Sequence, residues 1–110
     1  MPDLTEQQKE AIGQFQAYQQ QLQSILIQKE SMRLHGLEID KAIEELGKTK
    51  EENAFKIAGN VIISKPVVEL KKELEDNKEA LEIRIKSLEK TEERANSKLK
   101  ELQDKIREIS

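Results

Sequence analysis

Apolar residues recur at alternating steps of three and four along two long stretches of this chain, residues 4–46 and 67–109. The positions of the first stripe are Leu4, Gln8, Ala11, Phe15, Tyr18, Leu22, Ile25, Lys29, Met32, Gly36, Ile39, Ile43 and Leu46. Those of the second stripe are Val67, Leu70, Leu74, Lys78, Leu81, Ile85, Leu88, Glu92, Ala95, Leu99, Leu102, Ile106 and Ile109. This spacing places each stripe on one face of an α-helix, with charged and amide side chains on the other faces. A narrow apolar seam of this kind is typical of a coiled coil, so the pattern predicts helices over residues 4–47 and 66–109.

A short β-branched segment lies between the two stripes. Residues 55–63 read Phe-Lys-Ile-Ala-Gly-Asn-Val-Ile-Ile, in which Gly59-Asn60 has the composition of a two-residue hairpin turn. We therefore expect a β-hairpin over residues 54–64, followed by Pro66 in the first turn of the second helix, where no N–H donor is needed. The predicted fold class is mainly α. One domain over residues 1–110 would contain a long antiparallel two-helix coiled coil with a single β-hairpin at the connection between the helices.

The ends of the first helix carry recognisable capping residues. Two N-terminal caps are available, Asp3 with Glu6 or Thr5 with Gln8, and the second pair has the sequence of a capping box. Gly47 follows the last apolar position and predicts a left-handed residue that ends the helix.

The equal length of the two stripes predicts how the helices pair. Folding the chain back at the hairpin pairs Leu46 with Val67, Ile39 with Leu74 and Ile25 with Leu88. In this register the helices are antiparallel, and both termini lie at the same tip of the coiled coil.

The hairpin has no third layer within the chain against which its apolar side chains can be buried. Phe55, Ile57, Val61 and Ile63 are expected on one face, with Ile62 on the other. An isolated two-stranded hairpin is only marginally stable in water, and both of its edges would be unpaired. We therefore predict that these five residues drive oligomerisation, with hairpins from several subunits joining into a shared sheet or a closed β-barrel.

Composition narrows the class of protein further. Aromatic residues make up 3% of the chain and charged residues 37%, a balance that suits a narrow helical seam rather than a thick globular core. Charges of both signs are interspersed and the net charge is −3, which argues against nucleic acid as a partner. No apolar run is long enough to span a membrane and the N-terminal residues do not resemble a signal peptide, so we expect a cytoplasmic protein without a membrane partner.

The residue patterns that support enzymatic chemistry are missing. The sequence contains no cysteine and no phosphate-binding glycine motif. His35 has Glu38 one turn further on, but two candidate ligands do not make a metal site. We therefore expect no cofactor, no bound metal and no enzymatic activity.

Four segments of the chain carry a resemblance to a known family. They are the glutamine-rich residues 15–23, residues 42–46 before the hairpin, the hairpin residues 55–63 and the charged residues 81–89. Together they closely resemble β subunits of the prefoldin family, of the archaeal type. The single hairpin midway between two equal helices is the discriminating feature, because coiled-coil helices resemble one another. Gly47 departs from the family pattern, since a good helix former is usual at this position.

The resemblance implies that the chain is a subunit of an ATP-independent molecular chaperone, a holdase. It implies a hexamer of two α and four β subunits, in which the hairpins form a double β-barrel platform. It also implies that the coiled-coil tips capture unfolded polypeptides and that the assembly delivers them to a group II chaperonin. The client-binding residues expected in the last turns near both termini are Leu4, Ala11, Ile12, Leu99, Leu102, Ile106 and Ile109. Packing within the seam is the alternative interpretation of each of these residues.

The same features allow other functions. A structural coiled-coil spacer or tether, dimerised through its hairpin, is the main alternative to the chaperone. A nucleic-acid-binding coiled coil is less consistent with the sequence, because Lys71 and Lys72 lie among acidic residues. The glutamines of the first helix are good helix formers on a solvated face, and a polar contact role for Gln14, Gln21 or Gln28 stays open.

Overall fold

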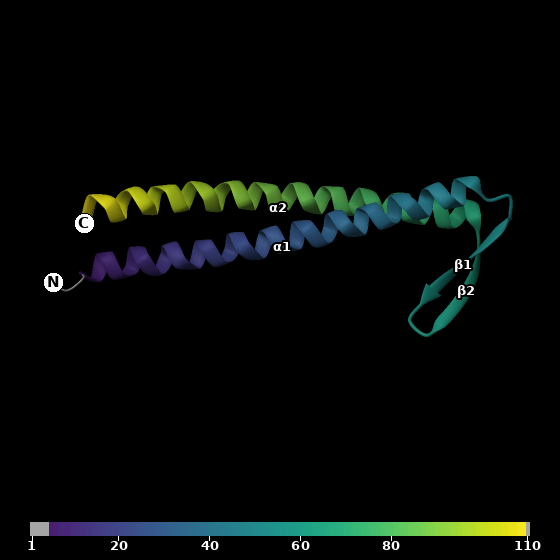
Figure 1. Ribbon diagram of the computed structural model, residues 1–110, viewed down its shortest axis with the longest axis horizontal. Helices are drawn as coiled ribbons and strands as arrows, with labels where there is room; N and C mark the ends of the chain where they lie inside the picture. The colour runs from purple at the N-terminus through teal and green to yellow at the C-terminus, as the bar shows by residue number, and fades with distance from the viewer. Residues whose placement is uncertain (1–4, 110) are drawn as a thin grey trace. The chain divides into compact units, whose positions relative to one another are not determined.

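A computed structural model describes residues 5–109 of the chain, which form two helices joined by two strands (Figure 1). The elements are α1 (Glu6–Lys48), β1 (Asn53–Ala58), β2 (Val61–Pro66) and α2 (Val67–Ile109). The strands form one antiparallel sheet of two members. The predicted fold class, two long helices with one hairpin between them, is confirmed.

The first helix begins at a capping box. The Thr5 N–H donates to Gln8 Oε1 at 2.8 Å, and the Gln8 N–H donates to Thr5 Oγ1 at 3.1 Å. Of the two predicted caps, the structure therefore uses the one that starts at Thr5, whereas Asp3 lies outside the described residues. These reciprocal bonds satisfy two of the amide groups that the first turn leaves without a helical partner.

The predicted left-handed cap at Gly47 is wrong. The helix continues through Gly47 to Lys48, and Gly59 in the hairpin turn is the glycine with a positive φ, 61°. The Thr49 N–H donates to the Glu45 carbonyl oxygen at 3.2 Å, which continues the ordinary helical hydrogen-bond pattern past the last residue. Because this bond already satisfies a carbonyl at the helix end, no left-handed residue is required there.

The described chain forms two compact units. The terminal unit contains residues 5–30 and 85–109, and the hairpin unit contains residues 31–84. Within each unit α1 and α2 run antiparallel (Figure 1). Every stripe position whose side chain is described is buried or half-buried, which is the pattern of a coiled-coil seam. The buried apolar residues are Ala11, Ile25, Ala95 and Leu102 in the terminal unit, and Ile39 and Leu70 in the hairpin unit.

The register of the helices differs from the predicted one. In the hairpin unit Asp40 forms an ion pair with Lys78, whereas the predicted pairing of Ile39 with Leu74 implies a partner roughly one and a half helical turns earlier on α2. The difference arises because the prediction aligned the ends of the two stripes. In the structure the strands pair symmetrically around the Gly59-Asn60 turn, from Ala58↔Val61 out to Asn53↔Pro66, and the Asp40–Lys78 pair lies close to symmetric about the same turn.

The seam of the terminal unit contains a partly buried ion pair. Lys29 Nζ lies 3.2 Å from Glu92 Oε1, and the side chains of the two residues are 9% and 22% exposed. Lys29 and Glu92 are the charged positions that interrupt the two apolar stripes in this unit, where Gln8 is a further polar position. A buried charge without a partner destabilises the folded state. The charge of each residue is therefore tolerated in the seam because the other residue neutralises it.

Candidate functional sites: the hairpin face and the terminal groove

The hairpin places three large apolar side chains on one face. Cross-strand partners in an antiparallel pair project to the same side of the sheet, and Ile57 pairs with Ile62. Phe55, two residues before Ile57, shares that side because side chains alternate along a strand. We call these three residues the outer face of the hairpin. The prediction that Ile62 points away from Phe55 and Ile57 is therefore wrong, and Val61 and Ile63 are the residues that project to the opposite side.

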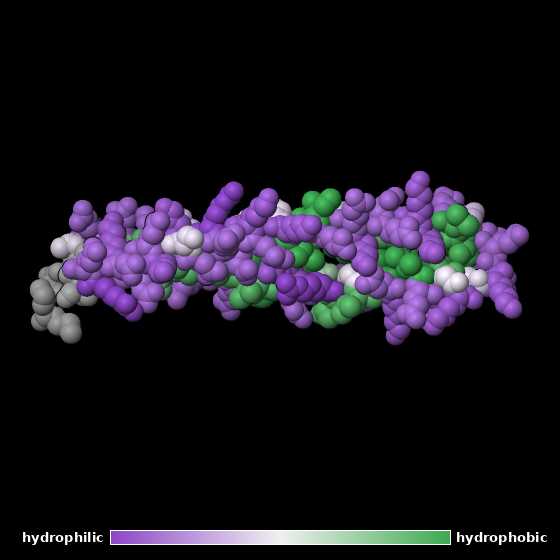
Figure 2. All heavy atoms as spheres, turned by 90° about the horizontal axis from the view of Figure 1, so that it is seen from above, coloured by the Kyte–Doolittle hydropathy of each residue, from purple (hydrophilic) through white to green (hydrophobic). Residues whose placement is uncertain are grey.

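The outer face is exposed in the single chain. Phe55, Ile57 and Ile62 are 75%, 76% and 67% exposed, and Val61 and Ile63 on the opposite side are 57% and 40% exposed. Figure 2 shows hydrophobic side chains gathered in green patches over the hairpin unit. Full burial of one such side chain stabilises a protein by about 1.5–3 kcal/mol. Exposed apolar clusters are typical of interaction surfaces, and the role of these residues in oligomerisation stays a prediction.

The opposite side of the hairpin is attached to α2 through charge. Lys56 from β1 and Lys65 from β2 both contact the carboxylate of Glu73, with Lys65 Nζ 3.3 Å from Glu73 Oε2. Hydrogen bonds from Lys56 and Lys65 hold the pKa of the Glu73 carboxyl below its usual value. The Val67 N–H also donates to the Glu52 carbonyl oxygen at 2.8 Å, which joins the two ends of the hairpin. These contacts turn one side toward α2 and leave the outer face available.

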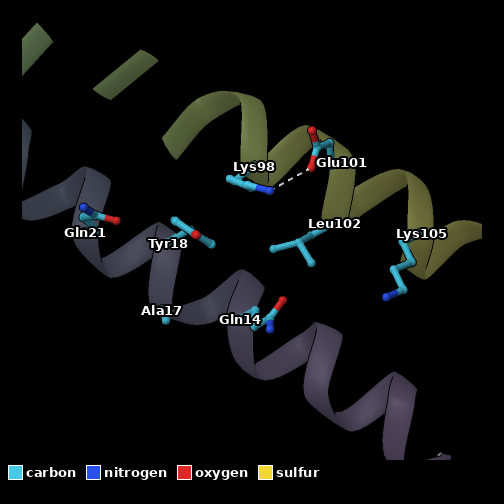
Figure 3. Close-up of a pocket in the computed structure, with 8 residues that line it drawn as sticks. All are labelled: Gln14, Ala17, Tyr18, Gln21, Lys98, Glu101, Leu102 and Lys105. Carbon is cyan, nitrogen blue, oxygen red and sulfur yellow. Dashed lines mark hydrogen bonds and ion pairs between the residues drawn. The ribbon is translucent and has the colours of Figure 1, made fainter. Parts of the chain in front are cut away.

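A groove runs between α1 and α2 in the terminal unit (Figure 3). Its volume is about 580 Å³, and its lining residues are Gln14, Ala17, Tyr18 and Gln21 from α1 and Lys98, Glu101, Leu102 and Lys105 from α2. A second hollow of about 910 Å³ shares Tyr18, Gln21, Lys98 and Glu101 with the first. Because the two hollows share these residues, they form one continuous surface, which we call the terminal groove.

The terminal groove combines apolar, amide and charged groups. Figure 3 shows Tyr18 from α1 and Leu102 from α2 directed into the space between the helices. Lys98 Nζ lies 3.3 Å from Glu101 Oε2, so one lysine and one carboxylate of the lining form an exposed ion pair. The groove therefore offers hydrogen-bonding groups together with apolar surface.

The structure brings one of the seven predicted tip residues into the terminal groove, and that residue is Leu102. Ala11 and Leu102 are 2% and 8% exposed, and Ile12, Leu99 and Ile106 are half-buried. Leu4 lies outside the described residues, as does the side chain of Ile109. The involvement of these residues in client binding stays a prediction.

Sequence reasoning did not identify Tyr18 or Ala17 as groove residues. Tyr18 was assigned to the seam, where it is half-buried, and Ala17 lies beside it on the same helix. A small side chain next to the seam, such as that of Ala17, leaves space between the helices. This small residue was the signal in the sequence from which a hollow at this position could have been predicted.

The described residues show neither a metal-binding cluster nor a membrane-spanning helix. No group of three or more histidine, cysteine, aspartate or glutamate side chains that could hold a metal ion occurs within residues 5–109. His35 Nδ1 lies 3.8 Å from Glu38 Oε2 in an exposed pair on α1. Neither helix, over its described residues, is long and apolar enough to cross a membrane.

The arrangement of two helices around one hairpin has close counterparts among known proteins. The model of a protein family described as "Prefoldin subunit" matches residues 9–109 of the chain. The chain belongs to the prefoldin family. Curated prefoldin β subunits that resemble it include the one from Thermococcus onnurineus, 37% identical over 96% of this chain and 92% of that protein. The prefoldin β subunit of Archaeoglobus fulgidus is 33% identical over 99% of this chain and 95% of that protein.

A solved structure supports the same assignment. The crystal structure of the prefoldin β subunit from Thermococcus strain KS-1 matches with a TM-score of 0.84 and 33% identity, covering 99% of this chain and 96% of that one. The resemblance to archaeal prefoldin β subunits that the sequence indicated is thus confirmed. Membership of the prefoldin family implies a chaperone function for this chain.

Proposed function

We propose that this chain is a subunit of an ATP-independent holdase that captures unfolded polypeptides and delivers them to a group II chaperonin. Its similarity to prefoldin β subunits over almost the whole chain carries the proposal. An open groove of mixed chemistry and an uncovered apolar hairpin face, both present in one small chain, are consistent with a protein that binds other proteins.

Assembly through the hairpin forms the first part of the proposal. The outer face of Phe55, Ile57 and Ile62 becomes buried when hairpins of several subunits join into β-barrels, within a hexamer of two α-type subunits and four copies of this chain. The unpaired strand edges favour this solution, because closure of a sheet removes edges that otherwise attract other chains. Lys56 and Lys65, attached to Glu73, hold the opposite side against α2, so the outer face points toward the neighbouring subunits.

Client capture by the terminal unit forms the second part. An unfolded polypeptide offers scattered apolar groups and unpaired backbone groups, and its binder needs an adaptable surface without a fixed shape. The terminal groove and the predicted tip residues around it provide such a surface. Each copy binds weakly, and several copies in one assembly bind the same client through a high effective concentration, so no nucleotide is needed.

The first test is native mass spectrometry of this chain alone and after mixing with an α-type prefoldin subunit from an archaeon, combined with light scattering of a chemically unfolded client during dilution. The proposal expects a heterohexamer with four copies of this chain that suppresses client aggregation without ATP. A complex of this stoichiometry that leaves aggregation unchanged would refute the holdase function while supporting the assembly.

A structural spacer dimerised through the hairpin would bury the same outer face. It differs from the holdase in two measurable ways, because it forms a stable homodimer that ignores the α-type partner and it does not suppress aggregation. A homodimer with both properties would replace the proposed function by the spacer.

A further inference from the structure

We propose that Gln14 and Gln21 in the terminal groove bind the main chain of an extended client segment, so that part of client recognition is independent of the client sequence. This inference rests on the proposed function of client capture and concerns which chemical group of the client is recognised.

The two amides are placed together by the helix. Gln14 lies four residues before Tyr18 and Gln21 lies three residues after it, so the three side chains occupy neighbouring positions on one face of α1. All three line the terminal groove opposite Leu102 of α2 (Figure 3). The face that carries the glutamines is therefore the face that borders the space between the helices.

Neither amide is engaged within the described chain. Gln28 donates to Ser24 Oγ at 3.0 Å and Gln8 is part of the capping box, whereas Gln14 and Gln21 form no hydrogen bond within residues 5–109. A glutamine side chain carries a donor and an acceptor, which are the two groups of a peptide unit. The exposed amides of Gln14 and Gln21 can thus pair with a main chain as one peptide unit pairs with another.

The spacing of the two amides suits an extended chain. Seven residues of helix separate Gln14 from Gln21, about 10 Å along the axis at a rise of roughly 1.5 Å per residue. An extended polypeptide advances roughly 3.3 Å per residue, so about three client residues span this distance. A client segment can therefore bond to both amides while a side chain between them packs against the ring of Tyr18.

Apolar contact alone leaves the amide groups of the groove unused. The two large apolar side chains of the groove are only partly accessible, since Leu102 is 8% exposed and Tyr18 is half-buried. The face of the terminal unit that is seen in Figure 2 carries mostly hydrophilic side chains. The main chain is the part that all unfolded polypeptides share, and its N–H and C=O groups lack partners until the polypeptide folds. An extended main chain is consequently the occupant whose chemistry matches this lining.

The test compares two peptides and three proteins. The probes are a fluorescent 15-residue peptide of alternating leucine and serine and the same peptide with N-methyl groups on alternate main-chain nitrogens, which keeps the side chains but removes donors. The proteins are the parent chain, the variant Gln14→Met/Gln21→Met, and the control Gln16→Met/Gln23→Met, whose residues are exposed on α1 with the same spacing but do not line the groove. Methionine keeps the helix propensity and adds apolar surface, and each protein is used as the full chain in the same assembly state, verified by native mass spectrometry.

We expect the parent and the control to bind the unmodified peptide about tenfold more tightly than the methylated one, as fluorescence anisotropy would measure. The groove variant should bind the unmodified peptide about tenfold more weakly than the parent and should no longer distinguish the two peptides. Equal or tighter binding by the groove variant would overturn the inference and leave the holdase function standing, because added apolar surface would then be sufficient. If the parent bound neither peptide and also failed to suppress aggregation, the proposed function and this inference would fall together.

Discussion

The partly buried ion pair between Lys29 and Glu92 allows a quantitative prediction. Replacing Lys29 by methionine leaves the carboxylate of Glu92 in the seam without its partner, and removing one member of a fully buried pair costs about 3–5 kcal/mol. Because the Glu92 side chain is 22% exposed, water replaces part of the lost interaction and the expected cost is lower. We expect the free energy of unfolding to fall by about 2 kcal/mol, which corresponds to a decrease in Tm of roughly 8 °C for a chain of this size.

The assay is thermal and urea unfolding followed by far-UV circular dichroism at one fixed protein concentration, since assembly makes apparent stability depend on concentration. The matched control is Lys9→Met, because Lys9 lies 3.9 Å from Glu6 in an exposed pair and should lose less than about 0.5 kcal/mol. The double variant Lys29→Met/Glu92→Leu restores an apolar seam and should unfold within about 1 kcal/mol of the parent or at higher urea. If Lys29→Met unfolded like Lys9→Met, the seam would be more hydrated than its geometry indicates and the reasoning would be refuted.

Three further predictions concern the hairpin and the terminal unit. Ile62→Asp places a charge on the outer face and should dissociate the assembly, as measured by multi-angle light scattering, while the helix content is retained. The control Ile83→Asp, at a similarly exposed apolar position on α2, should leave the mass of the assembly unchanged. An intact assembly in Ile62→Asp would contradict the role of the outer face. Deletion of residues 102–110 should preserve the assembly but weaken suppression of client aggregation, and full activity in the truncated chain would contradict the assignment of the terminal unit. The lowered pKa of Glu73 means that its contribution to stability is present above the unfolded value of about 4.5 and is lost as the pH falls through the lower folded value. The protection factor of the Lys65 amide hydrogen, which is its exchange rate compared with the intrinsic rate at the same pH, should therefore fall as the Glu73 carboxyl becomes protonated. Glu73→Gln should show the reduced protection factor already at pH 7, and a profile of protection against pH that matches the parent would show that the carboxylate does not hold the hairpin.

Much of the fold could be predicted because the seam is a local property of the sequence. A step of three or four residues places Ile25 or Leu102 on the buried face whichever partner it meets, so the helices and the seam followed from periodicity. The register did not follow, since many alignments of two similar stripes bury apolar residues equally well. The Gly59-Asn60 turn distinguishes among these alignments by fixing which residues face each other. Counting outward from that turn also places Ile57 opposite Ile62. The prediction that put Ile62 on the other face considered the composition of each strand and did not count the cross-strand pairs.

The candidate sites were partly accessible to sequence reasoning. The exposure of the five apolar hairpin residues could be predicted because the sequence offers no third layer to cover them, and their role in oligomerisation stays a prediction. The terminal groove was not predicted, because a hollow depends on the sizes of side chains that meet across two helices. Tyr18 looked like any other seam residue in the sequence, and its place in the groove became apparent only with Leu102 opposite it.

Tyr18 has one more consequence. It is the single tyrosine of the chain, which contains no tryptophan, and it lies in both hollows of the terminal groove. Excitation of the protein near 280 nm therefore produces fluorescence from the Tyr18 ring in the terminal groove. Any bound molecule without its own tyrosine or tryptophan leaves that emission as the whole signal, so the protein carries a built-in optical probe of the terminal groove and needs no attached dye.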